Sequence, residues 1–226
     1  MVREGYQRML DGLHASVVEL GEQVRRQLEE GLEALVKHDC TKAGRLDAAD
    51  DVVDSATLRI EKACVDLVSL QQPVAGDLRL ITASYKIVTD LERIGDLAVN
   101  LGDYCCAAET LDLVPPATIE AAGRLALEML EEAVRAYSER DPERAETVIR
   151  RDRDLDEMTW GTIRDFVKRL YLSEREGHDD AEAERISSQA MPILLSMRDL
   201  ERVGDHAENI AARVVYIATG GRSSAG

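Results

Sequence analysis

Apolar residues recur at alternating spacings of three and four along most of this chain. The clearest stripe consists of Leu46, Ala49, Val53, Ala56, Ile60, Ala63, Leu67 and Leu70. Similar stripes run over residues 87–105 and 200–217. This is the pattern of a helix that buries one face in a bundle, and it excludes strands in these segments.

Prolines mark the places where this pattern breaks. Pro73, the pair Pro115 and Pro116, and Pro142 each fall between two apolar stripes, where proline ends one helix or begins the next. We therefore predict helices over residues 3–37, 40–71, 75–108, 116–139, 142–173 and 181–218. The remaining proline, Pro192, lies inside the last of these helices and predicts a kink there.

The sequence also repeats itself. Residues 90–101, DLERIGDLAVNL, return as residues 199–210, DLERVGDHAENI, at an offset of 199 − 90 = 109. A weaker repeat pairs residues 50–54 with residues 152–156, at an offset of 152 − 50 = 102. We expect the difference between the two offsets to lie in a longer loop at residues 173–181, against a tight turn in the first half.

An internal duplication of long helices predicts the fold class. It is all-α, with two tandem three-helix bundles built from six long antiparallel helices. We expect the first bundle at residues 1–112, the second at residues 113–219, and a flexible tail at residues 220–226. Aromatic residues make up only 4% of the chain, so aliphatic side chains must fill the core.

Charge narrows the range of partners. The 226 residues carry a formal net charge of −16, so phosphate backbones and anionic lipids would repel the chain, and nucleic acid is not an expected partner. Much of this charge is that of any solvated surface, but acidic surfaces also suit cations and basic patches on other proteins.

The sequence has neither a secretory signal at its start nor an apolar stretch of membrane-spanning length, so we expect a cytoplasmic protein without membrane insertion.

The four cysteines show no metal-binding or disulfide spacing. They are Cys40, Cys64, Cys105 and Cys106, with no CxxC pair among them, and reduced thiols are the simplest expectation. Cys64 and Cys105 occupy apolar helix positions, where a thiol acts as a small hydrophobe. The neighbours Cys105 and Cys106 are a candidate redox pair.

Each copy of the repeated motif places three oxygen-bearing side chains four residues apart, on one helix face. The first copy contributes Glu92, Asp96 and Asn100, and the second contributes Glu201, Asp205 and Asn209. With Leu91 and Ile94 assigned to the buried seam, these side chains should point outward. An ordinary solvated helix face would show the same pattern, so the spacing alone leaves both interpretations open.

The preceding helix brings further acids to the same level. In an antiparallel hairpin, residues equally far from the turn lie side by side. Asp54 and Glu92 are equally far from Pro73, and so are Asp50 and Asp96. The first hairpin therefore predicts a quartet of carboxylates beside one another.

The second hairpin predicts the same arrangement independently. Asp156 and Glu201 are equally far from the step between residues 178 and 179, and so are Asp152 and Asp205. Four carboxylates at one level repel one another unless cations or basic groups intervene. Oxygen ligands without paired histidines suit Mg, Ca, Mn or Fe, so we predict metal binding at both quartets.

Three kinds of neighbouring residue bear on these quartets. Arg93 and Arg202 are placed to neutralise part of the charge. Gly95 and Gly204 lie in mid-helix at a cost of about 0.5 to 1 kcal/mol relative to alanine, which indicates either close helix packing or room for an ion. His206 follows Asp205; we expect it to be solvated, with a nitrogen ligand to the second quartet as the alternative.

The duplicated motif resembles the hallmark of the PhoU family. The matching residues are ERIGD at 92–96 and ERVGD at 201–205, together with QPVAGDLR at 72–79, which resembles the family's segment opening the third helix. The resemblance covers nearly the whole chain. It implies a non-enzymatic negative regulator of phosphate uptake and of the phosphate-starvation two-component response.

The resemblance also implies cofactors and partners. It implies a multinuclear metal cluster of Fe, Zn, Mn or Mg at the duplicated motifs. The implied partners are the sensor histidine kinase of the phosphate regulon and the ATPase subunit of the phosphate ABC transporter. A homodimer, held at the inner face of the membrane through these partners, is also implied.

Two other functions stay open from the residues alone. One is a carboxylate-bridged di-metal enzyme in a helical bundle, which would use Glu-x-x-His motifs that face the core. Neither Glu92 nor Glu201 has a histidine three residues later. The other is a metal-free helical scaffold.

Overall fold

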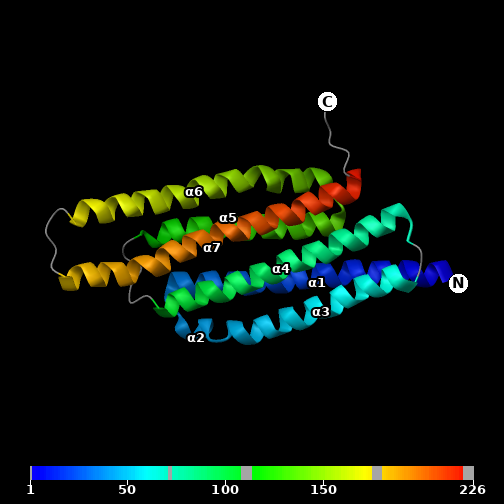
Figure 1. Ribbon diagram of the computed structural model, residues 1–226, viewed down its shortest axis with the longest axis horizontal. Helices are drawn as coiled ribbons and strands as arrows, with labels where there is room; N and C mark the ends of the chain where they lie inside the picture. The colour runs from blue at the N-terminus through cyan, green and yellow to red at the C-terminus, as the bar shows by residue number, and fades with distance from the viewer. Residues whose placement is uncertain (1, 71–72, 108–113, 175–179, 221–226) are drawn as a thin grey trace, which may run out of the picture.

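The computed structural model describes residues 2–70, 73–107, 114–174 and 180–220 (Figure 1). The helices are α1 (Val2–Lys37), α2 (Cys40–Ala43), α3 (Leu46–Leu70), α4 (Ala75–Ala107), α5 (Pro116–Glu139), α6 (Pro142–Glu174) and α7 (Asp180–Thr219). No strand occurs in these four ranges. The predicted all-α class is confirmed.

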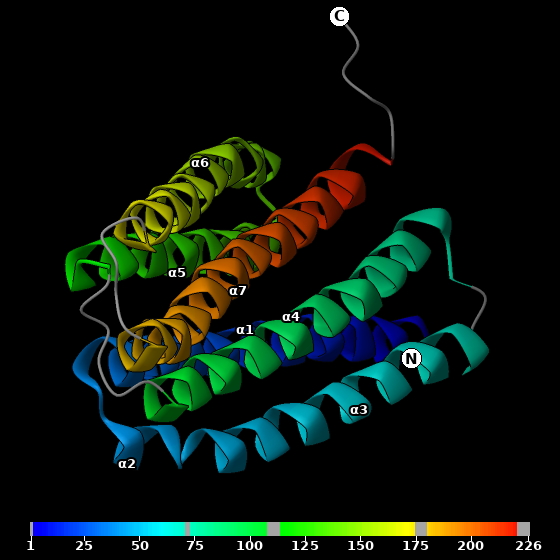
Figure 2. The same ribbon diagram turned by 60° about the vertical axis from the view of Figure 1, so that its left-hand side comes forward.

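The helices form two groups of three that lie against each other. Helix α1 packs on α3 and α4, and α5 packs on α6 and α7. The groups meet along α1 with α5 and along α4 with α7, which run side by side through the middle of the molecule (Figures 1 and 2). Buried apolar side chains form one continuous cluster across all six long helices. The predicted boundary at residue 112 lies outside the described residues and stays a prediction.

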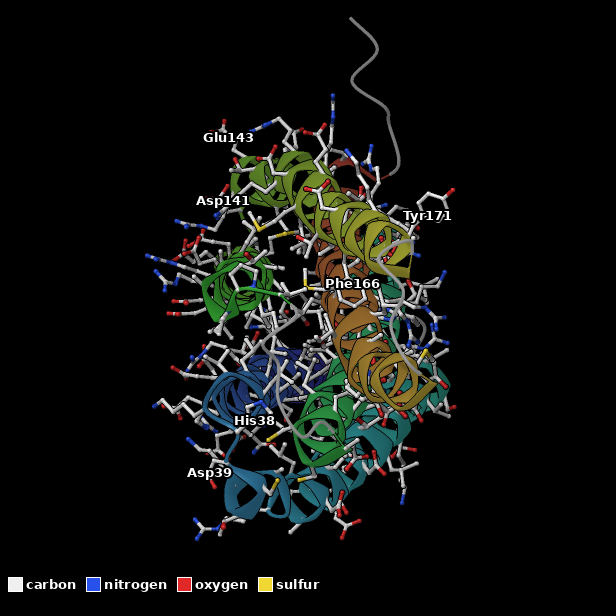
Figure 3. The ribbon with its side chains drawn as sticks, turned by 90° about the vertical axis from the view of Figure 1, so that its left-hand side faces the viewer. His38, Asp39, Asp141, Glu143, Phe166 and Tyr171 are labelled. Atoms are coloured by element: carbon white, nitrogen blue, oxygen red, sulfur yellow. The ribbon has the colours of Figure 1, made fainter. Side chains whose placement is uncertain are left out.

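The predicted helix over residues 40–71 is wrong near its start, because it is two helices. The backbone of His38 takes a left-handed conformation with φ of 53°, which ends α1. The Asp39 carboxylate then accepts hydrogen bonds from the backbone N–H groups of Thr41 and Lys42 and so caps α2 (Figure 3). Helix α2 ends at Gly44 after a single turn, and α3 begins at Leu46.

The remaining helix ends agree with prediction to within one or two residues. Helix α7 continues through Pro192, so the proline does not end it; the kink at this position stays a prediction. The predicted loop at residues 173–181 is shorter than expected, because α6 includes residues 173–174 and α7 includes residues 180–181. The rest of that loop, residues 71–72 of the predicted turn, and all but the first residue of the tail lie outside the described residues. None of the described helices has an apolar stretch long enough to cross a membrane.

Glycine allows α1 to approach α4 closely. A Cβ atom added to the buried Gly31 would lie 2.5 Å from the backbone carbonyl oxygen of Ala98 on α4. Such an overlap with backbone cannot be relieved by a rotamer change. The contact sets the height of α4 in the bundle, and α4 carries the first copy of the repeated motif.

We predict that Gly31→Ala lowers the free energy of unfolding by about 1 to 3 kcal/mol, because the added methyl group collides with α4. Gly12 on the same helix is the matched control, since a Cβ atom added there would have no neighbour within 4 Å. Gly12→Ala should raise stability by about 0.5 to 1 kcal/mol through helix propensity. Urea denaturation followed by circular dichroism measures both. A stabilised Gly31→Ala protein would contradict the close contact.

Candidate metal centre

The two copies of the repeated motif face a common crevice. Helix α4 lies beside α7 (Figure 2). The motif residues of both helices therefore line one cavity of about 650 Å³. Its lining residues are Arg93, Asp96, Leu97, Asn100, Arg202, Asp205, His206, Glu208 and Asn209. The two predicted quartets therefore contribute to the same face of the molecule.

The first acidic cluster forms between α3 and α4 as the hairpin geometry predicts. Burial raises the pKa of Glu92, and the neighbouring charges of Asp96 and Asp54 raise it further. Burial likewise raises the pKa of Asp96, with added contributions from Asp50 and Asp54. These four carboxyl groups are therefore close enough to repel one another. Asp54 and Asp96 are exposed, whereas Asp50 and Glu92 are half-buried.

Gln27 of α1 belongs to this first cluster and was not predicted from the sequence. Its side chain is only 3% exposed, and its Nε2 donates to Asp50 Oδ1 at 3.0 Å and to the Gly95 carbonyl at 3.4 Å. Burial raises the pKa of Asp50, and the Gln27 amide opposes that effect. The one available signal was a polar residue between Val24 and Leu28 in an apolar stripe.

The second acidic cluster contains five carboxylates. Besides the predicted Asp152, Asp156, Glu201 and Asp205, it includes Glu208 of α7. Carboxylate oxygens of Asp152, Asp205 and Glu208 all lie within 4.8 Å of one another. Burial raises the pKa of Asp152 to about 7, and Glu208 is the largest of the neighbouring charges that add to this shift. Glu208 was missed because the first motif copy has Val99 at that position.

The two clusters differ in whether the protein supplies a hydrogen-bond donor to the aspartate beside the motif glycine. In the second cluster, Met129 lies where Gln27 lies in the first, since each is a neighbour of the equivalent glycine. A thioether cannot donate a hydrogen bond. Asp152 Oδ1 is accordingly buried without a hydrogen-bond partner among the described residues. A buried carboxylate oxygen without a donor costs free energy unless it is protonated or binds a cation.

The motif glycines make room for these aspartates. A Cβ atom on Gly204 would lie 2.6 Å from Leu155 Cδ2 and 3.0 Å from Asp152 Oδ1. A Cβ atom on Gly95 would lie 3.1 Å from Asp50 Oδ1. The predicted close approach of a neighbouring helix is therefore confirmed, and its carboxylate occupies the space of the missing side chain. The alternative reason, room for an ion, stays a prediction.

Polar contacts between α4 and α7 fix the relative position of the two motif copies. Asn100 Nδ2 donates to Asp199 Oδ2 at 3.2 Å, and the Tyr104 hydroxyl donates to the same oxygen at 2.8 Å. His206 Nδ1 lies 2.9 Å from Asp90 Oδ1. His206 is only 9% exposed, so the expectation of a solvated histidine is wrong. It follows Asp205 in sequence but turns toward α4.

The arginines at the crevice neutralise only part of the charge. Arg202 and Arg93 lower the pKa of Asp96, yet burial and the neighbouring aspartates raise it by more, so the net shift is upward. Arg202 also pairs with Asp199 at 3.4 Å. The carboxylates of both clusters are therefore only partly neutralised by the arginines, and a cation placed among them would reduce their mutual repulsion.

The donor set fits a hard cation. In the second cluster three carboxylates from α6 and α7 lie within 4.8 Å of one another, and one of their oxygens is buried and unpaired among the described residues. The described acids of the first cluster include no group of three that is this close. Divalent and trivalent ions that prefer oxygen ligands match this chemistry. By these criteria the second cluster is the better site.

Comparisons with known proteins agree with this architecture. The family model of the PhoU domain matches residues 17–105 and again residues 119–214. The phosphate-specific transport system accessory protein PhoU homolog of Clostridium acetobutylicum is 31% identical over 229 residues, which cover 97% of each chain. The homolog of Rhizobium meliloti is 28% identical over 221 residues, covering 97% of this chain and 89% of its own.

Two solved structures are close in fold. The crystal structure of PhoU from Pseudomonas aeruginosa has a TM-score of 0.83 and 27% identity, and the match covers 95% of this chain and 99% of that one. The phosphate transport system regulatory protein PhoU from Streptococcus pneumoniae has a TM-score of 0.82 at 23% identity and supports the fold alone.

The raised pKa of Asp152 gives a pH dependence whose sign can be worked out. Its folded pKa of about 7 lies above the ordinary value of 3.8, so the folded state binds the proton more tightly. The contribution to stability is present below pH 4 and is lost as the pH rises toward 7. In metal-free protein with chelator, Asp152→Asn should therefore raise the free energy of unfolding at pH 8, by roughly 1 to 2 kcal/mol after allowance for partial solvation, and flatten its pH profile.

The exposed Asp154 on the same helix supplies the control. Asp154→Asn should leave the stability profile between pH 4 and pH 8 unchanged. Urea titrations at four pH values measure both variants. Identical profiles for Asp152→Asn and the parent protein would show that Asp152 carries no electrostatic penalty.

Proposed function

This chain belongs to the PhoU family, and from that premise we propose that it is a metal-binding accessory protein that regulates phosphate transport. The proposal rests on one observation in particular: the second of two duplicated acidic clusters contains a buried carboxylate oxygen without a donor among the described residues. Both clusters also contribute acids to one crevice, Asp96 from the first and Asp205 and Glu208 from the second. The names of the relatives supply the phosphate-transport context.

We propose that the two clusters hold the metal ions. In the first, the ligands are Asp50, Asp54, Glu92 and Asp96. In the second, they are Asp152, Asp156, Glu201 and Asp205, joined by Glu208. The bound cations would neutralise the carboxylates and link α3 to α4 and α6 to α7. Asn209 is exposed at the crevice and available as a further oxygen donor, while Asn100 uses its amide nitrogen on Asp199.

The metals proposed are Fe, Zn, Mn or Mg, in clusters of more than one ion. The oxygen-only donor set of each cluster favours the harder ions of this group. Several carboxylates in each cluster exceed what one ion needs, which supports more than one ion per site. Asp156 and Glu201 widen the second cluster beyond the three acids that lie nearest one another.

We propose that the protein acts as an adaptor and not as a catalyst. It would restrain both the phosphate ABC transporter, through its ATPase subunit, and the sensor histidine kinase of the phosphate regulon when phosphate is plentiful. A strongly acidic surface suits contacts with basic patches on such partners. Contacts with these partners would hold the protein at the inner face of the membrane.

The di-metal enzyme is the less favoured alternative. Its ligands would project into the apolar core, whereas Asp54, Asp96 and Asp205 are exposed to solvent. Leu91 and Ile94, which precede and follow the first motif glutamate, fill the seam instead. The acids thus lie outside the apolar seam, and Asp96, Asp205 and Glu208 line the open crevice.

Because only the first cluster has a hydrogen-bond donor to its aspartate among the described residues, we expect the two clusters to differ in metal affinity. We expect Asp152→Asn/Glu208→Gln to weaken Mn²⁺ binding at the second cluster by at least about tenfold, because it removes the negative charge of the buried carboxylate and that of the neighbouring acid that raises its pKa most. The first-cluster change Asp50→Asn should have a smaller effect, since Gln27 already satisfies that carboxylate. Isothermal titration of chelator-treated protein measures the affinities.

The matched control for this titration is Asp154→Asn/Glu157→Gln, two exposed acids of α6 that remove the same charge. It should bind Mn²⁺ like the parent protein. If the control lost as much Mn²⁺ affinity as Asp152→Asn/Glu208→Gln, the loss would reflect the change in net charge alone. That result would count against the assigned ligands.

Regulation is tested in cells that lack their own PhoU protein. Expression of this chain should lower phosphate uptake in phosphate-rich medium, and the variant Glu92→Ala, Asp96→Ala, Glu201→Ala, Asp205→Ala should not. Uptake of radiolabelled phosphate measures the effect, with immunoblots to match protein levels. Affinity capture of the chain should recover the sensor kinase and the transporter ATPase. Unchanged uptake together with the absence of both partners would refute the regulator.

A further inference from the structure

Three of the four cysteines meet at one end of the bundle. Cys40 begins α2, and Cys105 and Cys106 lie in the last turns of α4. The Sγ atoms of Cys40 and Cys105 are 4.0 Å apart, and the three sulfur atoms all lie within 4.8 Å of one another. None of the three lines the acidic crevice. The sequence pointed only to the neighbouring pair, because Cys40 is 65 residues away from Cys105.

The chain holds Cys40 in place on both sides. The backbone N–H of Asp39 donates to the Ala34 carbonyl at 3.0 Å, which closes the end of α1. The Asp39 carboxylate caps α2 directly after it, and the Gly44 N–H donates to the Cys40 carbonyl at 3.1 Å (Figure 3). Backbone hydrogen bonds on both sides of Cys40 therefore fix the short connection in which it lies.

Gly102 lets this connection reach α4. A Cβ atom at Gly102 would lie 2.7 Å from Leu46 Cδ1 and 3.2 Å from Ala43 Cβ. Gly102 precedes Cys105 and Cys106 by one helical turn. The missing side chain thus allows α2 to rest on α4 and brings Cys40 to the other two thiols.

The spacing of the sulfur atoms matches a shared metal ion. Metal–sulfur bonds of about 2.3 Å, arranged around one ion in a trigonal plane, place the sulfur atoms about 4 Å apart. The Cys40–Cys105 separation of 4.0 Å already has that value. Within this group the described residues add no histidine or carboxylate ligand, so an ion there would be three-coordinate or complete its shell with water.

The cluster of three cysteines is buried on one side and open to solvent on the other. Cys105 is buried, whereas Cys40 and Cys106 are exposed, so an ion can enter from solvent. Burial, then the contact with Cys40, raises the pKa of Cys105 to about 12, and the contact with Cys40, then burial, raises the pKa of Cys106 to about 11. Protonated thiols are poor nucleophiles, which argues against a redox pair. A thiophilic cation displaces these protons, because the metal–thiolate bond forms as each S–H bond gives up its proton to solvent.

We propose that Cys40, Cys105 and Cys106 form a binding site for one soft, thiolate-preferring cation, Cu⁺ or Zn²⁺, distinct from the acidic clusters. Sulfur ligands select such ions over Mg²⁺, Mn²⁺ or Ca²⁺. The protein would thus have two kinds of metal site with opposite preferences. A cation at the cysteines would tie the α1–α2 connection to the end of α4.

The test uses the full chain, metal-free and kept reduced with a phosphine. Cu⁺ and Zn²⁺ are each titrated against a chromophoric chelator of known affinity. We expect one equivalent of one of these ions to bind with a thiolate-to-metal absorption band and release of about three protons. Zn²⁺ held by carboxylates has no such band, so the band reports the cysteine site alone. Cys40→Ser/Cys106→Ser changes two exposed positions and should lower the affinity at least about 100-fold while the circular dichroism spectrum stays that of the parent protein.

Two controls separate this site from the rest of the molecule. Cys64→Ala changes the one cysteine outside the cluster and should retain the full affinity. Asp96→Asn/Asp205→Asn/Glu208→Gln should retain it too, because the acids are not ligands of this ion. Binding that survives Cys40→Ser/Cys106→Ser, that vanishes in the acid variant, or that is absent for both ions would overturn the proposal.

Discussion

The packing of α4 against α7 is the contact on which the rest of the structure depends. Leu97 and Leu101 of α4 and Val203 and Ile210 of α7 are fully or almost fully buried in the common core. On each helix the acids follow the buried residues by only one or two positions, so burial of the apolar stripe determines where the acids point. Hydrophobic packing thereby holds like charges together that would separate if the helices were free.

The two halves of the duplication carry different residues beside their acidic clusters. The first copy has Gln27, which satisfies a buried aspartate with its amide; the second has Met129, which cannot. The second copy also has Glu208 where the first has Val99. The first half therefore supplies a hydrogen-bond donor to its aspartate, whereas the second leaves an oxygen of Asp152 without one among the described residues.

Much of this arrangement could be predicted from the sequence. Apolar periodicity and proline positions give helices of the right length, and the spacing of acids around Pro73 correctly places Asp50, Asp54, Glu92 and Asp96 together. The residues that were missed act across the fold. Gln27 reaches its partner from a helix far away in sequence, and His206 turns toward Asp90 although Asp205 is its neighbour. Local patterns carry no information on such contacts. The break between α2 and α3 was missed because a four-residue helix is too short to show a period of its own.

The hydrogen bonds of two aspartates, one in each motif copy, connect the two halves of the duplication. Asp90 and Asp199, the first residues of the two motif copies, each find their partner in the opposite half. Asp199 is 2% exposed, and the donors to its Oδ2 atom, Asn100 and Tyr104, belong to the other half. Within the intact bundle, loss of one of these donors would cost about 1 to 3 kcal/mol. A substitution in one half at Asn100, Tyr104 or His206 would therefore unsettle a carboxylate of the opposite half, so the two repeats are coupled by polar contacts as well as by their common core.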